Sequence, residues 1–206
     1  MKGEGVMFSA TIIMIFALLL FLFGCMVLPM SDVATIITTI TAIIGAFAIW
    51  FQMKRERDIN EAEFIMNYNI NFIENPEYVE LEHKLEKYKI AVESGKNIHE
   101  MEDIITEENK QTVINYLVYH EALAVFVKKK VLAIDSIDDL FAYRFFLIMN
   151  NPEVQKKELC PEAQYYHGCF WLHKKWTEYR QKKGLYILLE NTSLEKTDEY
   201  NKIIGI

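Results

Sequence analysis

The sequence predicts an all-α protein in which an N-terminal transmembrane helical hairpin precedes a cytoplasmic helical bundle. Two observations predict the hairpin: residues 6–28 and 33–51 carry no charged side chain, and only four residues separate these two apolar runs. A third observation predicts the bundle. After residue 53 the apolar side chains recur at helical spacing, and no stretch alternates convincingly with the period of a strand.

Both apolar runs are long enough to cross a bilayer. About 20 residues, rising about 1.5 Å each, span a hydrocarbon core of about 30 Å, and the runs hold 23 and 19 residues. Lipid offers no hydrogen-bond partners, so each run should be a helix. A signal peptide is the alternative for the first run, because Lys2 precedes it. Its apolar core is longer than the roughly 7–15 residues of such a segment, and no good cleavage site follows.

The charges that flank the runs predict the orientation, because Lys and Arg accumulate on the cytoplasmic side of spanning helices. Lys2 precedes the first run, and the hairpin loop carries only Asp32. Trp50 and Phe51 suit the membrane–water interface. The basic residues that follow them are interpreted as a cytoplasmic anchor: Lys54, Arg55 and Arg57. We therefore expect a multi-pass protein of the cell (inner) membrane with both termini in the cytoplasm.

These boundaries divide the chain into residues 1–52 (hairpin), 53–184 (cytoplasmic helical domain) and 185–206 (C-terminal arm). The chain has 22 basic and 29 acidic residues, a formal net charge of −7. That balance argues against nucleic acid as a partner, since a basic face is the usual requirement. Three cysteines without CxxC spacing predict free thiols in a reducing compartment.

The second apolar run is followed by no Gly or Pro until Pro76, so we expect one continuous helix to about Ile73. Residues that favour helix ends divide the remainder. The further helices expected are 76–93 after Asn75, a central helix from the turn at Thr106 to Lys130, one from Ser136 to about Met149, a short one starting at Asn150-Asn151-Pro152-Glu153, and 161–183 before Gly184.

Cys169 and His173 are the residues most like metal ligands, because they lie four apart and share a helix face. A structural zinc site normally needs four ligands, so two more would have to come from elsewhere, for instance His120 or Glu121. We favour the alternative, in which the thiol and the ring pack into the core, and we expect no metal and no cofactor. His120 and Glu121 point about 100° apart on a helix and do not easily act on one atom. No catalytic residue is expected.

Asn67, Tyr68 and Asn71 lie on the helix that leaves the membrane, where asparagine is a poor helix former. They are candidates for an interaction surface. The alternative is that they are exposed positions on a helix held by its apolar stripe.

Small residues recur along the second apolar run at spacings that allow close helix packing. They are Ala34, Thr38, Ala42, Gly45 and Ala46. They can pack against the first run of the same chain or against another copy, in a homo-oligomer whose extreme form is a Thr-lined pore. Neither run holds an ionisable residue, the usual mark of an ion path.

Several segments resemble those of a known family. They are Glu63-Phe64-Ile65 with Asn67 and Asn69, Phe72-Ile73, Tyr119 to Lys128, Ile134-Asp135, Leu140 to Tyr143, and Trp176 with Tyr179-Arg180. Over roughly residues 55–183 the chain resembles a bacterial family of small two-span membrane-anchored helical proteins catalogued as a domain of unknown function. The resemblance implies the architecture and brings no catalytic residues.

The expected function is a membrane-tethered cytoplasmic interaction or sensing module without catalysis, whose partners are the lipid bilayer and a protein of unknown identity. The alternative is a membrane-perturbing effector whose hairpin oligomerises in response to a cytoplasmic signal. A metal-dependent hydrolase is a third, less favoured class.

Overall fold

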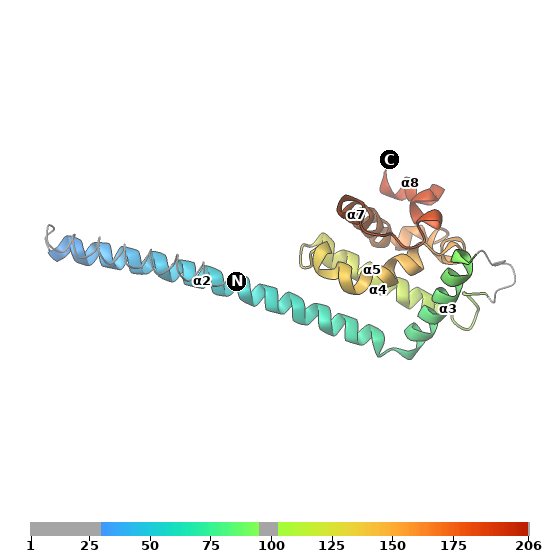
Figure 1. The fold of residues 1–206 in the computed structure, drawn as a ribbon, viewed down its shortest axis with the longest axis horizontal. Helices are drawn as coiled ribbons and strands as arrows, with labels where there is room; N and C mark the ends of the chain where they lie inside the picture. The colour runs from blue at the N-terminus through green and yellow to red at the C-terminus, as the bar shows by residue number, and fades with distance from the viewer. Residues whose placement is uncertain (1–29, 95–102, 206) are drawn as a thin grey trace. The chain divides into compact units, whose positions relative to one another are not determined.

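The computed structural model describes residues 30–94 and 103–205 (Figure 1). The first expected span, residues 6–28, lies outside the described residues. Within the described ranges the chain forms helices and turns and no strand, as predicted. Its contacts separate two compact units, Met1–Ile59 and Asn60–Ile206.

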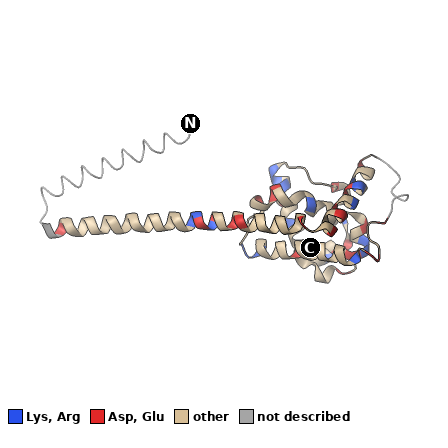
Figure 2. Cartoon of the chain, turned by 90° about the horizontal axis from the view of Figure 1, so that it is seen from below, with Lys and Arg blue, Asp and Glu red and all other residues tan. Residues whose placement is uncertain are grey.

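The first described helix, α2 (Met30–Ile73), runs for 44 residues without interruption, which confirms the predicted continuous helix. Its most apolar stretch has a mean hydropathy of 2.1, and 6 % of that stretch is buried. Figure 2 shows this stretch as a length of helix free of charged residues. Within the described part of the chain, α2 is the one helix long and apolar enough to cross a membrane.

Three threonine hydroxyls of α2 bond back to the helix itself. Thr38, Thr39 and Thr41 each donate to the backbone carbonyl four residues earlier, at 2.9 Å. In lipid an unpaired hydroxyl is costly, and this local bond removes the cost.

Helix α3 (Pro76–Glu93) begins as predicted. The Asn75 side chain accepts the Glu77 N–H at 3.0 Å, and Pro76 occupies the first helical turn. Both features are local, so the sequence pattern was sufficient to find them.

Helix α4 (Lys110–Lys128) starts later than expected, and Thr106 is not its cap. Asn109 uses its side chain elsewhere: it accepts the Thr106 N–H at 2.8 Å and donates to the Ile104 carbonyl at 2.7 Å. The amide side chain thus closes a turn before the helix, and the helix follows that turn.

Helix α5 (Ile134–Met149) starts two residues before Ser136, so Ser136 is not its cap either. The preceding residue, Ala133, is extended and donates its N–H to Glu61 of α2 at 3.3 Å. A contact across 72 residues fixes this start, and no local pattern could reveal it.

Next come α6 (Pro152–Val154), the π-helical turn η2 (Gln155–Leu159) and the 3₁₀ turn η3 (Ala163–Tyr165). The α6 start was predicted correctly, since the Asn151 side chain accepts the N–H groups of Glu153 and Val154. Helix α7 (His167–Lys183) was predicted to start at Pro161, which is wrong. Its end at Gly184 is confirmed, with φ +65°.

The start of α7 is set by α4. The Glu121 carboxylate accepts the N–H groups of Gly168 and Cys169, each at 2.7 Å. A negative charge at a helix N-terminus is stabilising. A Cβ at position 168 would overlap this carboxylate, so glycine lets the Glu121 carboxylate approach the two N–H groups closely.

Residues after Gly184 join the core of the second unit through three short elements: η4 (Glu190–Thr192), η5 (Leu194–Lys196) and α8 (Asp198–Ile204). Leu188, Leu194 and Tyr200 are buried there. Asn150, at the end of α5, holds the segment: it donates to the Leu188 carbonyl at 2.7 Å and accepts the Leu194 N–H at 3.1 Å.

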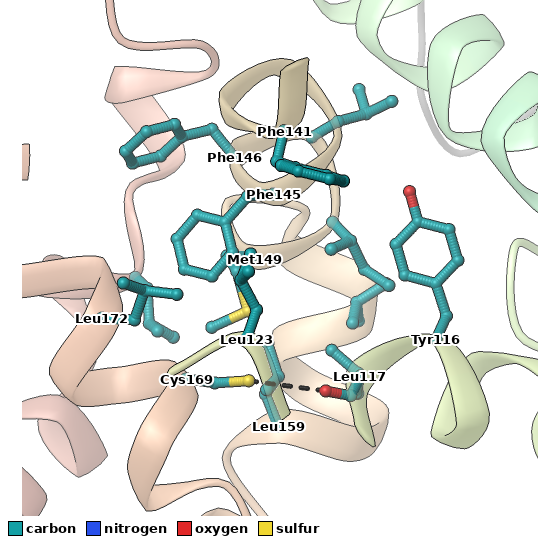
Figure 3. Packing of buried hydrophobic residues seen from close by; sticks show 14 of the residues in the cluster. Tyr116, Leu117, Leu123, Phe141, Phe145, Phe146, Met149, Leu159, Cys169 and Leu172 are labelled. Carbon is teal, nitrogen blue, oxygen red and sulfur yellow. Dashed lines mark hydrogen bonds between the residues drawn. The ribbon is translucent and has the colours of Figure 1, made fainter. Parts of the chain in front are cut away.

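The core of this unit lies between α4, α5 and α7, where large side chains pack with no exposure (Figure 3). Phe145 stacks on Trp176 with ring centroids 4.9 Å apart. The Trp176 indole N–H donates to Asp138 at 2.6 Å, and Arg180 pairs with the same carboxylate at 2.8 Å. Both partners of this pair are largely shielded from water, so the acid and the indole fix α5 against α7.

Asn150→Ala is expected to destabilise the chain by roughly 2–5 kcal/mol, because it leaves the buried Leu188 carbonyl and Leu194 N–H unpaired. Asn75→Ala, at an exposed cap, should cost about 1 kcal/mol. Denaturant unfolding of the full chain in mild detergent, followed by tryptophan fluorescence, compares the two. Equal losses of unfolding free energy in the two variants would contradict the anchoring role of Asn150.

Candidate functional site

Residues 60–73 of α2 belong to the second unit and use one face to join its core. Tyr68 stacks on Tyr119 of α4 with centroids 4.0 Å apart. Each hydroxyl donates to the backbone carbonyl of the other residue, at 2.5 Å from Tyr68 and 2.7 Å from Tyr119. Burial raises the pKa of both tyrosines, so both remain protonated donors. Tyr68, a candidate interaction residue, therefore packs within the unit.

Arg144 of α5 ties three helices together. Its guanidinium bonds to Glu82 of α3 at 3.1 Å and to the Asn69 side chain of α2 at 2.8 Å. It also lies 4.9 Å from the ring centroid of Phe72. Charge-assisted bonds of this kind are the stronger ones, so this part of α2 is held firmly.

The opposite side of the same helix is open. Met66, Ile70 and Ile73 are 52 %, 36 % and 45 % exposed, and Asn67 and Asn71 beside them are also exposed. Positions four and three apart share one side of a helix. We call these five residues the α2 outer face. It includes two of the three residues predicted as an interaction surface and adds three apolar ones.

The other sequence candidates on α2 lie in the first unit. The basic residues of the expected anchor, Lys54, Arg55 and Arg57, are all exposed. So are Ala34, Thr38, Ala42 and Ala46, while Gly45 has no atom within 4 Å of the place where a Cβ would stand. The small-residue stripe is therefore open to a second helix.

The structure gives Cys169 and His173 separate partners. The Cys169 thiol points to the Leu117 carbonyl at 3.5 Å (Figure 3), and burial raises its pKa well above the ordinary value. His173 Nε2 bonds to the Asn150 side-chain oxygen at 2.8 Å. Among residues 30–94 and 103–205, no group of three His, Cys, Asp or Glu side chains gathers as metal ligands.

His120 is fully buried among rings, including those of Tyr116 and Phe145. Neither ring nitrogen has a hydrogen-bond partner. Burial, aided by the Arg144 charge, lowers its pKa to about 3. Glu121 is occupied at the start of α7, so the two neighbours do not form one site.

Sequence reasoning missed a groove of about 440 Å³ between α5, the end of α7 and the C-terminal segment. Arg180 lines the groove. Its guanidinium donates to the Asp138 carboxylate at 2.8 Å and to the Tyr186 carbonyl at 2.9 Å. Tyr143 and Tyr186 are exposed at its sides. The groove depends on residues 185–188 lying against α5, and no local pattern predicts that packing.

The two buried histidines predict acid sensitivity. Burial lowers the pKa of His120 and of His173 to about 3, against an ordinary value of 6.5. Both stay neutral in the folded state, while the unfolded chain takes up protons below pH 6.5. Stability is therefore complete above about pH 6.5 and falls toward pH 3, by about 1.4 kcal/mol per pH unit for each histidine. Unfolding between pH 7.5 and about pH 5 measures the slope.

His120→Phe should halve this slope and leave stability at neutral pH nearly unchanged, since it removes an unpartnered polar ring. The exposed His83→Gln is the matched control and should keep the slope. An unchanged slope in His120→Phe would overturn the assignment.

Comparison with known proteins gives one family. Residues 35–153 match the family described as Domain of unknown function (DUF4760). The match starts inside the apolar part of α2 and stops at Glu153, so it begins earlier and ends earlier than the resemblance over roughly residues 55–183. No curated protein and no solved structure matches the chain. The match covers more than half of the sequence, and the chain belongs to the DUF4760 family of unknown function.

Proposed function

We propose that the chain is a membrane-tethered interaction module without catalysis, which docks a protein partner on the α2 outer face. The observation that carries the proposal is the continuity of α2. One helix supplies both an exposed apolar stretch of membrane-spanning length and, through Phe64, Tyr68 and Phe72, a wall of the second unit's core. A domain built on its own tether is suited to act at a membrane.

The proposal includes a two-span hairpin, residues 6–28 and 33–51, with both termini on the cytoplasmic side of the inner membrane. Support comes from the second uncharged run, the short connector, and the basic group after Phe51. The lipid bilayer is then the first partner.

The chemistry of the α2 outer face favours a helical protein partner. Met66, Ile70 and Ile73 form a short ridge of the kind that packs into a groove between side chains of a facing helix. Asn67 and Asn71 border the ridge and offer amide donors and acceptors without charge. An interface of about three turns is small, and a shared membrane raises the effective concentration of two tethered partners.

Photo-crosslinking in native membranes tests the docking surface. A photoreactive residue at Asn67 should give a discrete heavier adduct, and one at the exposed Lys87 of α3 should not. Ile70→Glu, in the same chain, should abolish the Asn67 adduct without lowering the midpoint of unfolding, because Ile70 is already exposed. An adduct that survives Ile70→Glu, or that forms equally at Lys87, would refute this surface.

The second candidate is a membrane-perturbing effector whose hairpin self-associates. It is favoured by one observation: Ala34, Thr38, Ala42 and Ala46 are exposed, and a Cβ at Gly45 would meet no atom within 4 Å. Small residues allow close backbone approach between membrane helices.

Gly45→Leu should then prevent self-association and restore membrane potential in cells that overexpress the chain. Ile44→Leu, beside it, is the matched control and should leave depolarisation intact. The readout is a potential-sensitive dye together with crosslinking of the full chain. Normal potential in cells that overexpress the wild-type chain would remove this candidate.

A further inference from the structure

The turn between α4 and α5 is a basic, partly apolar projection on an acidic protein. Lys128, Lys129 and Lys130 are all exposed, and Val131 beside them is 52 % exposed. We call these four residues the basic turn. Lys128 lies 5.1 Å from the ring of Trp171. Among the described residues, Lys129 and Lys130 form no ion pair, so their charges are available.

The turn is built to project. Lys130 has φ +57°, and the N–H groups of Val131 and Leu132 both bond to the Phe126 carbonyl, at 3.0 and 3.3 Å. This reverses the chain tightly after α4. Leu132 is 3 % exposed and anchors the far side of the turn in the core. The lysines and Val131 are thereby left outside on a fixed base.

The same turn is attached to the beginning of the second unit. Ala133 donates its N–H to Glu61, which lies ten residues after Phe51 in a continuous helix. The turn is thus tied, through Glu61, to the same helix that carries the apolar stretch.

The basic turn itself holds three lysines and no acidic residue. Glu61 accepts the Ala133 N–H, and Asp135 lies in the first turn of α5, where the helix dipole favours a carboxylate. An ammonium on a flexible stem suits phosphate headgroups as a point charge, and an adjacent valine suits the apolar edge of the interface.

We propose that the basic turn binds the anionic phospholipid headgroups of the membrane that α2 enters, as a second membrane contact besides the tether. This inference rests on the proposed membrane tether. The second unit would then have a lipid contact of its own in addition to its link to the tether.

Lysine footprinting of the full chain in nanodiscs tests the proposal. Discs contain phosphatidylcholine alone or phosphatidylcholine with phosphatidylglycerol, and acylation rates are read by mass spectrometry. Lys129 and Lys130 should react about fivefold more slowly in the anionic discs, the factor expected for one lysine near an anionic surface. The exposed Lys87 and Lys156 should not change, and high salt should remove the effect.

A double variant tests the same lipid contact by removing the charges of Lys129 and Lys130. Lys129→Gln with Lys130→Asn removes both charges, and asparagine tolerates the positive φ at 130. Acylation of Lys128, the remaining lysine of the basic turn, should be slower in anionic discs than in phosphatidylcholine discs for wild type, and this difference should shrink in the variant. Lys87→Gln with Lys156→Gln, the matched control, should behave as wild type.

The outcomes separate the two proposals. A chain that fails to stay inserted in either disc would refute the tether. An inserted chain whose basic turn reacts equally in both discs would refute only the lipid contact. Slow acylation of the turn in native membranes but in neither disc would mean that a protein partner covers it, and this result would overturn the lipid assignment.

Discussion

The account depends on the continuity of α2. The backbone N–H and C=O groups of a helix in lipid must be paired within the helix itself. Helix α2 is continuous from Met30 to Ile73, and no Gly or Pro lies between Gly45 and Pro76 to interrupt it. Three of its threonine hydroxyls bond back to the same helix. The last turns then carry the aromatic side chains that pack the second unit. The apolar stretch of membrane-spanning length and a wall of the second unit's core thus belong to one helix.

Inside the second unit, side-chain groups rather than local caps set the positions of the elements. Glu121 fixes the start of α7, Asn150 holds the C-terminal segment, and Arg144 joins α2, α3 and α5. Asn150 is fully buried, and Glu121 and Arg144 are partly buried, so their bonds are worth more than those of a fully exposed pair. The bonds of Asn69 and Tyr68 attach α2 to the second unit through its inner side. The α2 outer face can therefore stay exposed without weakening that attachment.

Features written in neighbouring residues could be predicted from the sequence. The long helix, the Asn75–Pro76 start, the Asn151–Pro152 start and the Gly184 end each depend on a short pattern. Three helix starts were missed because their partners lie far along the chain or in a turn: Asn109 for α4, Glu61 for α5 and Glu121 for α7. The sequence around Tyr68 could not predict which side of α2 packs against the core, because its partner Tyr119 lies 51 residues away. The groove at Arg180 needs the C-terminal segment to be in place first.

The central claim is that α2 enters the membrane with the second unit on the cytoplasmic side. Single-cysteine labelling of the full chain in intact cells tests it most directly. Native cysteines are first replaced, Cys25 and Cys160 by Ser and Cys169 by Ala. Asp32→Cys should react with a membrane-impermeant maleimide in intact cells, and Lys156→Cys only after permeabilisation. Labelling of both positions in intact cells, or of neither until permeabilisation, would contradict the account.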